Sequence, residues 1–240
     1  MEKLLQKIDL LKDKLRNHKR KIKNEYEDFK LNYIYNSNAI EGNTLTLKET
    51  KVVLEGITIG GKSIREHFEV INHNEAIEYV ENIIKEKQEL SEYIIKSIHN
   101  LILKNIDNEN AGIYRKENVI ISGANHKPID YIFIPEEMER FIEWYKNENN
   151  LHPVLKAAKV HIDVVGIHPF IDGNGRLCRL LMNLELLKNG YEAITIENSR
   201  KAEYYEYLDH AHCTADYNPF YKLIAEYELR RLESLIENLH

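Results

Sequence analysis

The sequence has few of the residues that interrupt helices or cross-link a chain. Only 10 of its 240 residues are glycine, 5 are proline and 2 are cysteine. Because the two cysteines, Cys178 and Cys213, form no CxxC pair, the sequence argues against a disulfide framework and fits a reducing compartment. The scarcity of glycine and proline beside abundant Leu, Ile, Glu and Lys favours a helical protein.

An excess of positive charge and long apolar runs are missing as well. The formal net charge is −6, whereas broad binding of nucleic acid needs a basic face. No apolar run approaches the ~18 residues that a membrane helix requires. The N-terminal segment carries charges throughout, unlike a signal peptide. We therefore expect a cytoplasmic protein that binds neither nucleic acid nor membrane.

Hydrophobic periodicity predicts a single domain that is mostly α-helical. Apolar residues recur at helical intervals over 4–29, which we interpret as one long amphipathic helix. A second helix is expected over 33–40 and a short one over 46–53, where Thr46 and Glu49 have the spacing of a capping box. Later helices are expected over 67–87, 91–104, 154–167 and 177–188.

One stretch between these helices has a different composition. Residues 119–123 read VIISG, residues 131–134 read YIFI, and a turn-rich segment separates them. Short β-branched and aromatic runs joined by a turn predict a small β-hairpin. Pro135 then restarts a helix, since proline is favoured in a first helical turn.

The segment 168–179, which reads HPFIDGNGRLCR, concentrates residues suited to a phosphate. Pro169 and the run Gly173-Asn174-Gly175 prevent a helix, so we expect one to begin at about Asn174 or Gly175. Glycines before a helix leave backbone N–H groups free and let an anion approach closely. Arg176 and Arg179 project from the first turn of the same helix, which suits a polyphosphate.

Asp172 and His168 add chemistry to this segment. An acid beside two arginines and a phosphate is unfavourable unless Mg²⁺ lies between them, so Asp172 is predicted to be a magnesium ligand. His168, at the end of the preceding helix, is placed to take a proton from an attacking hydroxyl. The alternative is a surface loop with ordinary capping residues, which arginines at a helix start do not favour.

This segment resembles the motif HxFx[DE]GNGRxxR of the Fic family at every fixed position. Residues 111–115 resemble the family's GxYR segment and residues 119–134 its flap, and the likeness extends over about 36–220. The resemblance implies the mainly α Fic fold, a helical bundle with a small β-hairpin flap over the active site. It also implies transfer of AMP from ATP to a hydroxyl of a target protein.

The resemblance assigns a role to each position of the motif. His168 is implied as the general base for a Ser, Thr or Tyr hydroxyl, and Asp172 as the ligand of Mg²⁺ on the α- and β-phosphates. Arg179 pairs with the γ-phosphate. The remaining ATP-binding positions cradle or flank the phosphates: Gly173, Asn174, Gly175 and Arg176. The family's kinase branch carries Lys at the place of Gly175, so glycine there favours nucleotidyl transfer.

Two further segments are implied to complete the site. Tyr204 lines the adenine pocket together with His212, which stands where the family often has Asn; amphipathic packing is the alternative for the tyrosines. The flap residues Ile121, Ser122, Gly123 and Ala124 align the target by strand pairing, and His126 in the turn is expected to be exposed.

Residues 37–43 read SNAIEGN. Alone, they are a helix end with a glycine stop, although Glu41 is an acid at the negative end of a helix dipole. The stretch resembles the family's inhibitory motif [ST]xxxE[GN], which begins here at Ser37. The resemblance implies that Glu41 pairs with Arg179 and blocks productive binding of the γ-phosphate.

The resemblance also divides the chain. We expect an N-terminal amphipathic helix packed on the core (1–35), a Fic domain (36–225) that includes an inhibitory helix at about 33–42, and a C-terminal helix (226–240). The N-terminal helix is interpreted as a solvated packing helix, and a role in a homodimer is left open.

Three functions stay open at this point. The first is an AMP transferase that uses Mg²⁺ and ATP, modifies an unknown target protein or itself, and is inhibited by Glu41. The second is an enzyme that removes AMP, alone or in addition, with Glu41 orienting a water molecule. The third is a nucleotide-binding regulatory module without turnover, against which the set His168, Asp172 and Arg179 speaks. A zinc site at His161 and His168 lacks a further ligand at suitable spacing.

Overall fold

The computed structural model describes residues 1–16 and 23–238, and this part of the chain is built from helices without a β-strand. The α-helices are α1 (Glu2–Arg16), α2 (Lys23–Ile40), α3 (Leu47–Leu54), α4 (Ile64–Lys85), α5 (Glu92–Leu103), α6 (Ile134–Asn147), α7 (Pro153–Ile167), α8 (Asn174–Lys188), α9 (Lys201–Thr214) and α10 (Asn218–Glu237). Two short 3₁₀ helices are η2 (Tyr131–Phe133) and η3 (Asn198–Arg200). The mainly α prediction is confirmed.

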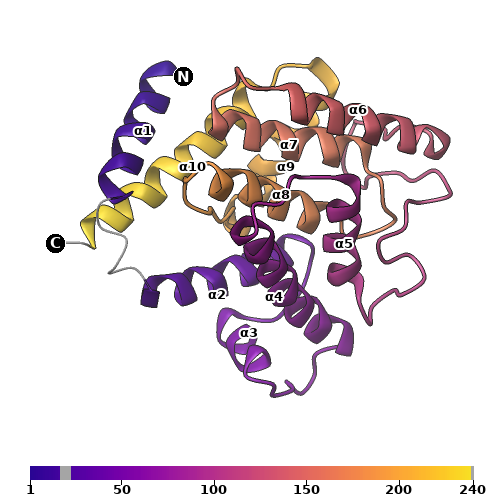
Figure 1. Cartoon of the computed structure of the whole chain (residues 1–240). Coiled ribbons are helices and arrows are strands. Elements are labelled where there is room, and N and C mark those ends of the chain that lie inside the picture. The colour runs from indigo at the N-terminus through magenta and orange to yellow at the C-terminus, as the bar shows by residue number, and fades with distance from the viewer. Residues whose placement is uncertain (17–22, 239–240) are drawn as a thin grey trace.

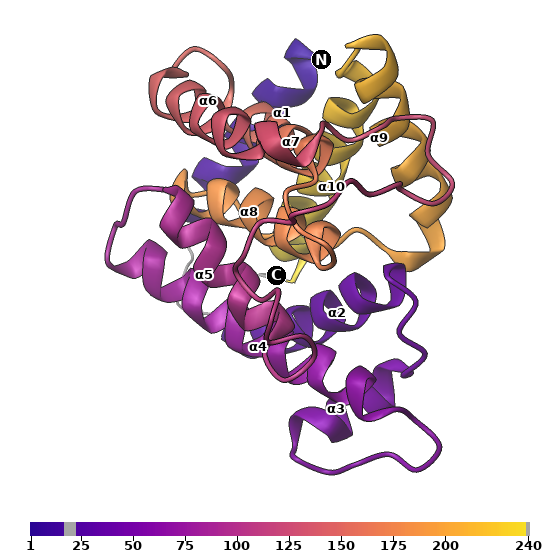
Figure 2. The same cartoon turned by 90° about the vertical axis from the view of Figure 1, so that its right-hand side faces the viewer.

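The pair α7 and α8 forms the centre of the molecule (Figures 1 and 2). On one side α4, α5 and α6 pack against it around apolar side chains such as Ile95, Ile98 and Val164. On the other side α1, α9 and α10 enclose a second apolar cluster that includes Ile8 and Phe220. Helix α8 is buried along nearly its whole length, so its polar side chains need partners inside the protein.

Side-chain caps fix where several helices begin. Thr46 and Glu49 form the predicted capping box at α3, and Ser63 forms another with Glu66 at α4. Ser91 caps α5. These caps confirm the predicted helix starts near residues 46 and 91 and move the start of α4 three residues ahead of the predicted 67.

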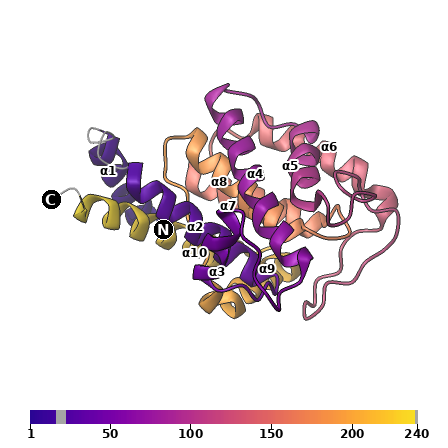
Figure 3. The ribbon, with the colours of Figure 1, turned by 90° about the horizontal axis from the view of Figure 1, so that it is seen from below.

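The prediction of one helix over 4–29 is wrong, because α1 ends at Arg16 and α2 begins at Lys23. The two helices pack on different neighbours. Helix α1 lies along α10 at one end of the molecule, away from α5 and α6 (Figures 1 and 3), whereas α2 contacts α3, α4 and α8. The expected boundary at residue 35 therefore falls inside α2, and the last helix begins at Asn218 rather than 226. The middle of the predicted helix, 17–22, lies outside the described residues.

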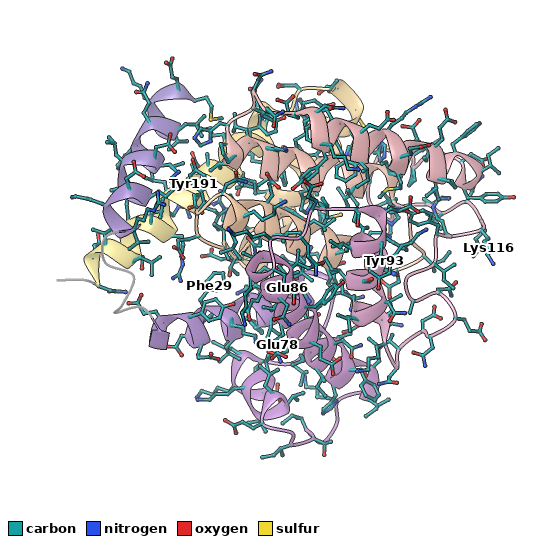
Figure 4. All side chains as sticks on the ribbon, in the orientation of Figure 1. Phe29, Glu78, Glu86, Tyr93, Lys116 and Tyr191 are labelled. Atoms are coloured by element: carbon teal, nitrogen blue, oxygen red, sulfur yellow. The ribbon has the colours of Figure 1, made fainter. Side chains whose placement is uncertain are left out.

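The N-terminal helix α1 packs against α10. Ile8 and Leu15 are its buried residues. The hydroxyl of Tyr191, which Figure 4 labels beside α1, donates to Asp9 Oδ1 at 2.6 Å. No helix in the described part of the chain is long and apolar enough to span a bilayer.

The predicted β-hairpin is not formed. Residues 118–130 are an irregular loop, and Tyr131–Phe133 is a 3₁₀ turn that leads into α6. Side chains take the place of a strand ladder: Arg115 donates to the carbonyls of Glu117 (2.8 Å) and Ile129 (2.6 Å), and Asn118 Oδ1 accepts from Tyr131 N–H at 2.9 Å. We call residues 118–130 the flap loop.

Candidate active site

The segment 168–173, which we call the motif loop, connects α7 to α8 and is held from inside by the side chain of Asn174. His168 ends α7 in the left-handed conformation, with φ 53° and ψ 59°. Asn174 Oδ1 accepts from Phe170 N–H at 3.1 Å, and its Nδ2 donates to the Phe170 carbonyl at 2.8 Å. The predicted phosphate-contacting Asn174 is therefore buried, and its amide serves to shape the loop.

Two buried residues to which the sequence assigned no role also hold the motif loop. His99 on α5 accepts from Gly112 N–H through Nδ1 at 2.9 Å and donates through Nε2 to the Asp172 carbonyl at 2.8 Å. Burial lowers the pKa of His99 to about 4, so the ring is neutral near pH 7. Arg115 Nε donates to the His168 carbonyl at 2.9 Å. A polar residue in the apolar pattern of α5 was the signal for His99.

His168 is a neutral imidazole directed at the site. Its Nδ1–H donates to the Val165 carbonyl at 3.3 Å, which leaves Nε2 as the nitrogen with a lone pair. Burial is the main reason that its pKa is lowered to about 4. His168 lies beyond the end of α7, so it does not share a helix face with His161, although the seven-residue spacing of the two histidines would place them on one face of a continuous helix.

Arg179, on α8, is hydrogen-bonded to residues of two other helices, α2 and α9. Its guanidinium is 1% exposed. It donates from Nε to Ser37 Oγ at 2.9 Å and from Nη2 to the Ser37 carbonyl at 2.8 Å, both on α2. Nη1 donates to the Tyr204 hydroxyl on α9 at 3.3 Å. Burial opposes the charge, but Tyr204 and Glu41 outweigh it and raise the pKa of Arg179, so the guanidinium stays charged.

Glu41, just after the end of α2, completes this cluster. Its Oε1 accepts from Arg179 Nη2 at 2.7 Å. The same oxygen lies so close to Gly175 that a Cβ added there would overlap it. The carboxylate thus occupies the N-terminal turn of α8, where free N–H groups favour an anion. The predicted contact between Glu41, Ser37 and Arg179 is present in the structure.

Asp172 and Arg176 form a second charged group at the same turn. Asp172 Oδ1 accepts from Gly173 N–H at 2.6 Å and from Arg176 Nη2 at 3.2 Å, and Arg65 of α4 donates to Oδ2. Burial raises the pKa of Asp172, but Arg176, the Gly173 N–H and Arg65 together outweigh burial and lower it. The carboxylate is therefore ionised near pH 7. Gly173, with φ 78°, packs on His99, where a Cβ would lie 3.3 Å from Nε2.

A cavity of about 630 Å³ opens beside these groups. It is lined by many of the predicted site residues: Glu41, Ile121, Ser122, Gly123, Ala124, His168, Gly175, Tyr204 and His212. Tyr205 and Asp209 of α9 line it too. Arg179 does not, since Glu41 and Tyr204 lie against its guanidinium.

The flap loop runs beside α9 (Figure 2) and is hydrogen-bonded to α9 and α7. The Asp209 carboxylate accepts from Asn125 N–H at 2.8 Å, Asn125 Nδ2 at 2.7 Å and His126 N–H at 2.8 Å. His126 Nε2 donates to the Gly166 carbonyl at 2.9 Å, and its ring lies 4.4 Å from that of His212. His126 is half-buried, so the prediction that it is exposed is wrong.

Tyr204 and His212 have partners within the protein. The buried Tyr204 hydroxyl donates to His161 Nε2 at 2.8 Å, and His212 Nε2 donates to the Ile162 carbonyl at 2.9 Å. The His161 ring is therefore bound to Tyr204 of α9. The described residues contain no group of three His, Cys, Asp or Glu side chains that would hold a metal. Cys178 is buried, as predicted.

Comparison with known proteins agrees with this geometry. Residues 89–186 match the model of the Fic/DOC family. The "Protein adenylyltransferase Fic" of Nematostella vectensis is 37% identical over 98% of this chain and 56% of its own length. The protein of that name from Drosophila grimshawi is 39% identical over 81% of this chain and 40% of its own. The chain spans about half the length of the curated relatives it matches.

Two solved structures have the same fold. Fic-1 from C. elegans is 31% identical, with a TM-score of 0.86 over 99% of this chain and 72% of that one. A Fic domain-containing signalling protein from Bacteroides thetaiotaomicron is 30% identical, with a TM-score of 0.87 over 96% of each chain. With the complete motif at 168–179 and a match to these structures along nearly its whole length, the chain belongs to the Fic/DOC family.

Proposed function

We propose that the chain is a protein adenylyltransferase that Glu41 holds inactive. The observation that carries the proposal is the arrangement around one cavity of a neutral His168 and the N-terminal turn of α8, with Glu41 bound where an anion belongs. A cavity of about 630 Å³ has room for a nucleotide. Relatives named protein adenylyltransferase at 37–39% identity support the reaction class.

In the proposed reaction His168 Nε2 accepts the proton of a Ser, Thr or Tyr hydroxyl of the target. The hydroxyl oxygen then forms a bond to the α-phosphorus, and the bond from that phosphorus to the bridging oxygen of the β-phosphate breaks. The products are the AMP-modified target and pyrophosphate. The protein would contribute mainly position and charge, with the triphosphate placed against Arg179 and the N–H groups at the start of α8 and Arg176 beside them.

The residues present fit one magnesium ion bound together with the phosphates. Asp172 is an ionised carboxylate, 41% exposed. One carboxylate plus substrate phosphates is the usual way in which proteins bind Mg²⁺. When bound, Mg²⁺ neutralises charge on the phosphates. Asp172 would hold it, and His168 would act on the hydroxyl without contact to the metal.

The base is proposed to lie at the α9 side of the cavity. Tyr204 and His212 line this side, and the ring of Tyr205, also on α9, is 40% exposed. Because the His212 Nε2–H is already bound to the Ile162 carbonyl, we propose that His212 contributes its ring face and that Nε2 takes no part in base recognition.

Inhibition follows from competition for Arg179. A γ-phosphate and the Glu41 carboxylate need the same guanidinium and the same helix N-terminus. A buried, charge-assisted pair is worth about 1–3 kcal/mol, which corresponds to roughly a 5- to 150-fold loss of active enzyme. Glu41→Gly should raise the rate of AMP transfer by this factor.

Self-labelling with α-³²P-ATP and Mg²⁺ tests the proposal. Glu41→Gly should label strongly and wild type weakly, and Glu41→Gly combined with His168→Ala should not label. Exposed Glu55, at the end of α3, provides the matched control Glu55→Gly, which should behave as wild type. Equal labelling of wild type and Glu41→Gly would refute the inhibition. No labelling of self or of a cell extract, with ATP bound, would refute AMP transfer.

Removal of AMP is a second candidate, favoured by one observation. Glu41 is bound to Arg179 through one oxygen, yet its side chain is 29% exposed and lines the cavity, so it is available to orient a water molecule. Release of AMP from a labelled protein by wild type, but not by Glu41→Gly, would support this activity.

A further inference from the structure

Arg65, on α4, lies outside every motif of the sequence yet reaches the motif loop. Helices α4 and α8 are in contact, which brings the first turn of α4 near the start of α8 (Figure 3). Arg65 Nη2 donates to Asp172 Oδ2, and Arg65 Nε donates to Glu69 Oε1 at 3.1 Å. A cation from the protein therefore sits on the carboxylate to which the proposed function assigns Mg²⁺.

The three donors to Asp172 differ in how easily they can leave. The Gly173 N–H is part of the backbone at the start of α8. Arg176 is 2% exposed and lies with Nη1 3.5 Å from Glu69 Oε1. The Arg65 side chain is 54% exposed. Arg65 is therefore the one of these three that can release an oxygen of Asp172 without disturbing the helix or the motif loop.

We propose that Arg65 takes the place of the metal on Asp172 in the nucleotide-free protein and leaves Oδ2 when the metal–nucleotide complex binds. The inference rests on the proposed function, in which Asp172 is the metal ligand. It makes Arg65 a positioning residue that sets how much Mg²⁺ the site requires.

Glu69 confines the exchange of Arg65 for the metal to a movement of the Arg65 side chain. The Glu69 carboxylate accepts from Arg65 Nε and, at 2.9 Å, from Asn43 Nδ2. It is buried where α4 meets the segment that follows Glu41. Arg65 can turn its Nη2 away from Asp172 while Nε stays bound to Glu69. What is lost is one half-exposed ion pair, and removing that pair should change the apparent metal affinity by about two- to fivefold.

The test measures binding and does not depend on AMP transfer. A fluorescent, non-hydrolysable ATP analogue is titrated into Glu41→Gly and into Glu41→Gly with Arg65→Gln, first in excess EDTA and then at rising Mg²⁺. We expect the Mg²⁺ midpoint to fall about two- to fivefold in the double variant, with unchanged affinity in EDTA. Arg65→Lys, which keeps the charge but offers one nitrogen in place of the two that bind Glu69 and Asp172, should lie between.

Arg140→Gln is the matched control, because Arg140 is similarly exposed and paired to Glu136 and Glu137 on α6. It should leave the midpoint unchanged, and melting curves of all variants establish that they are folded.

An unchanged Mg²⁺ midpoint in Arg65→Gln would mean that the pair of Arg65 and Asp172 is a surface contact only. Weaker binding in EDTA would mean that Arg65 binds the phosphates directly. Either result overturns the proposal while Asp172 and the proposed function stand. If Mg²⁺ alters nucleotide binding in no variant, the metal role of Asp172 fails and this inference fails with it.

Discussion

The motif loop and the flap loop border the same cavity but are fixed in opposite ways. The motif loop is held by buried groups, namely the Asn174 amide, the His99 ring and the Arg115 guanidinium. The tip of the flap loop is held at the surface by the Asp209 carboxylate and by His126. Buried hydrogen bonds break only when the core opens, whereas surface bonds break locally. Under the proposed function, the motif loop would be a rigid wall for the nucleotide and the flap loop an adjustable wall for the target.

Phe170 offers the strongest way to break the motif loop. Its ring is fully buried and stacks on His99 with 3.6 Å between ring centroids. Phe170→Ala removes both the packing and the ring on which His99 stacks, and should lower the free energy of unfolding by about 3–5 kcal/mol. Urea denaturation measures the loss. Phe170→Leu, which keeps apolar volume but loses the ring, should cost clearly less, and a similar loss in both would mean that the stack on His99 rather than apolar packing carries the stability.

The second largest effect is expected from acid, which should lower the stability that the motif loop contributes. His99 and His168 have folded pKa values of about 4, below the ordinary 6.5, chiefly because they are buried. The unfolded chain binds protons below pH 6.5 while the folded chain does not. The stability from these rings is therefore complete above pH 6.5 and is lost as the pH falls towards 4, by up to about 3 kcal/mol for each ring.

Denaturation midpoints between pH 4 and 7 measure this slope. His99→Gln should flatten it, whereas His210→Gln, at an exposed ring paired only with Asp216, should not. A wild-type slope in His99→Gln would contradict the assignment. For the same reason His168 stays a neutral base well below pH 6.5, so the acid limb of kcat/KM for AMP transfer should lie below that pH.

The sequence predicted one of these loops better than the other, for a physical reason. The motif loop is specified by adjacent residues, so Asp172 pairs with Arg176, Gly175 lies beside Arg179, and His168 and Gly175 line one cavity. The supports of that loop, His99 and Arg115, lie far away in sequence. The polar residue in the apolar pattern of α5 marks His99, but it does not reveal which loop the ring contacts. Their roles depend on how α5 and the segment before the flap loop pack against the motif.

The flap loop shows the opposite case, in which a local pattern misleads. VIISG and YIFI have strong β-propensity, but a strand needs a partner for its backbone, and Arg115, Asn118 and Asp130 take those bonds instead. Ile134, counted as the end of a strand, is fully buried as the first residue of α6. In the same way one amphipathic pattern over 4–29 could not indicate that its two ends pack on different helices.

Substitution of Asp209 is expected to have the smallest effect on stability and the most selective effect on the flap loop. Asp209→Asn keeps the shape of the side chain but weakens three charge-assisted hydrogen bonds from Asn125 and His126. Because these bonds lie at the surface, we expect a stability loss of no more than about 1 kcal/mol. In a Glu41→Gly background the KM for the target protein should rise about threefold to tenfold, while the affinity for ATP stays constant because His168, Arg176 and Arg179 are untouched.

Asp216→Asn, just after the same helix, is the control, since Asp216 bonds only to neighbouring residues and to His210. Hydrogen exchange of residues 119–126 gives an independent readout, and it should quicken in Asp209→Asn while residues 168–174 keep their protection. An equal change in the ATP affinity and the target KM would show that the flap loop and the nucleotide wall are mechanically one unit. The contrast between a rigid and an adjustable wall would then be false. A rise in the target KM alone would locate target alignment in the flap loop, whose tip the Asp209 carboxylate helps to hold in place.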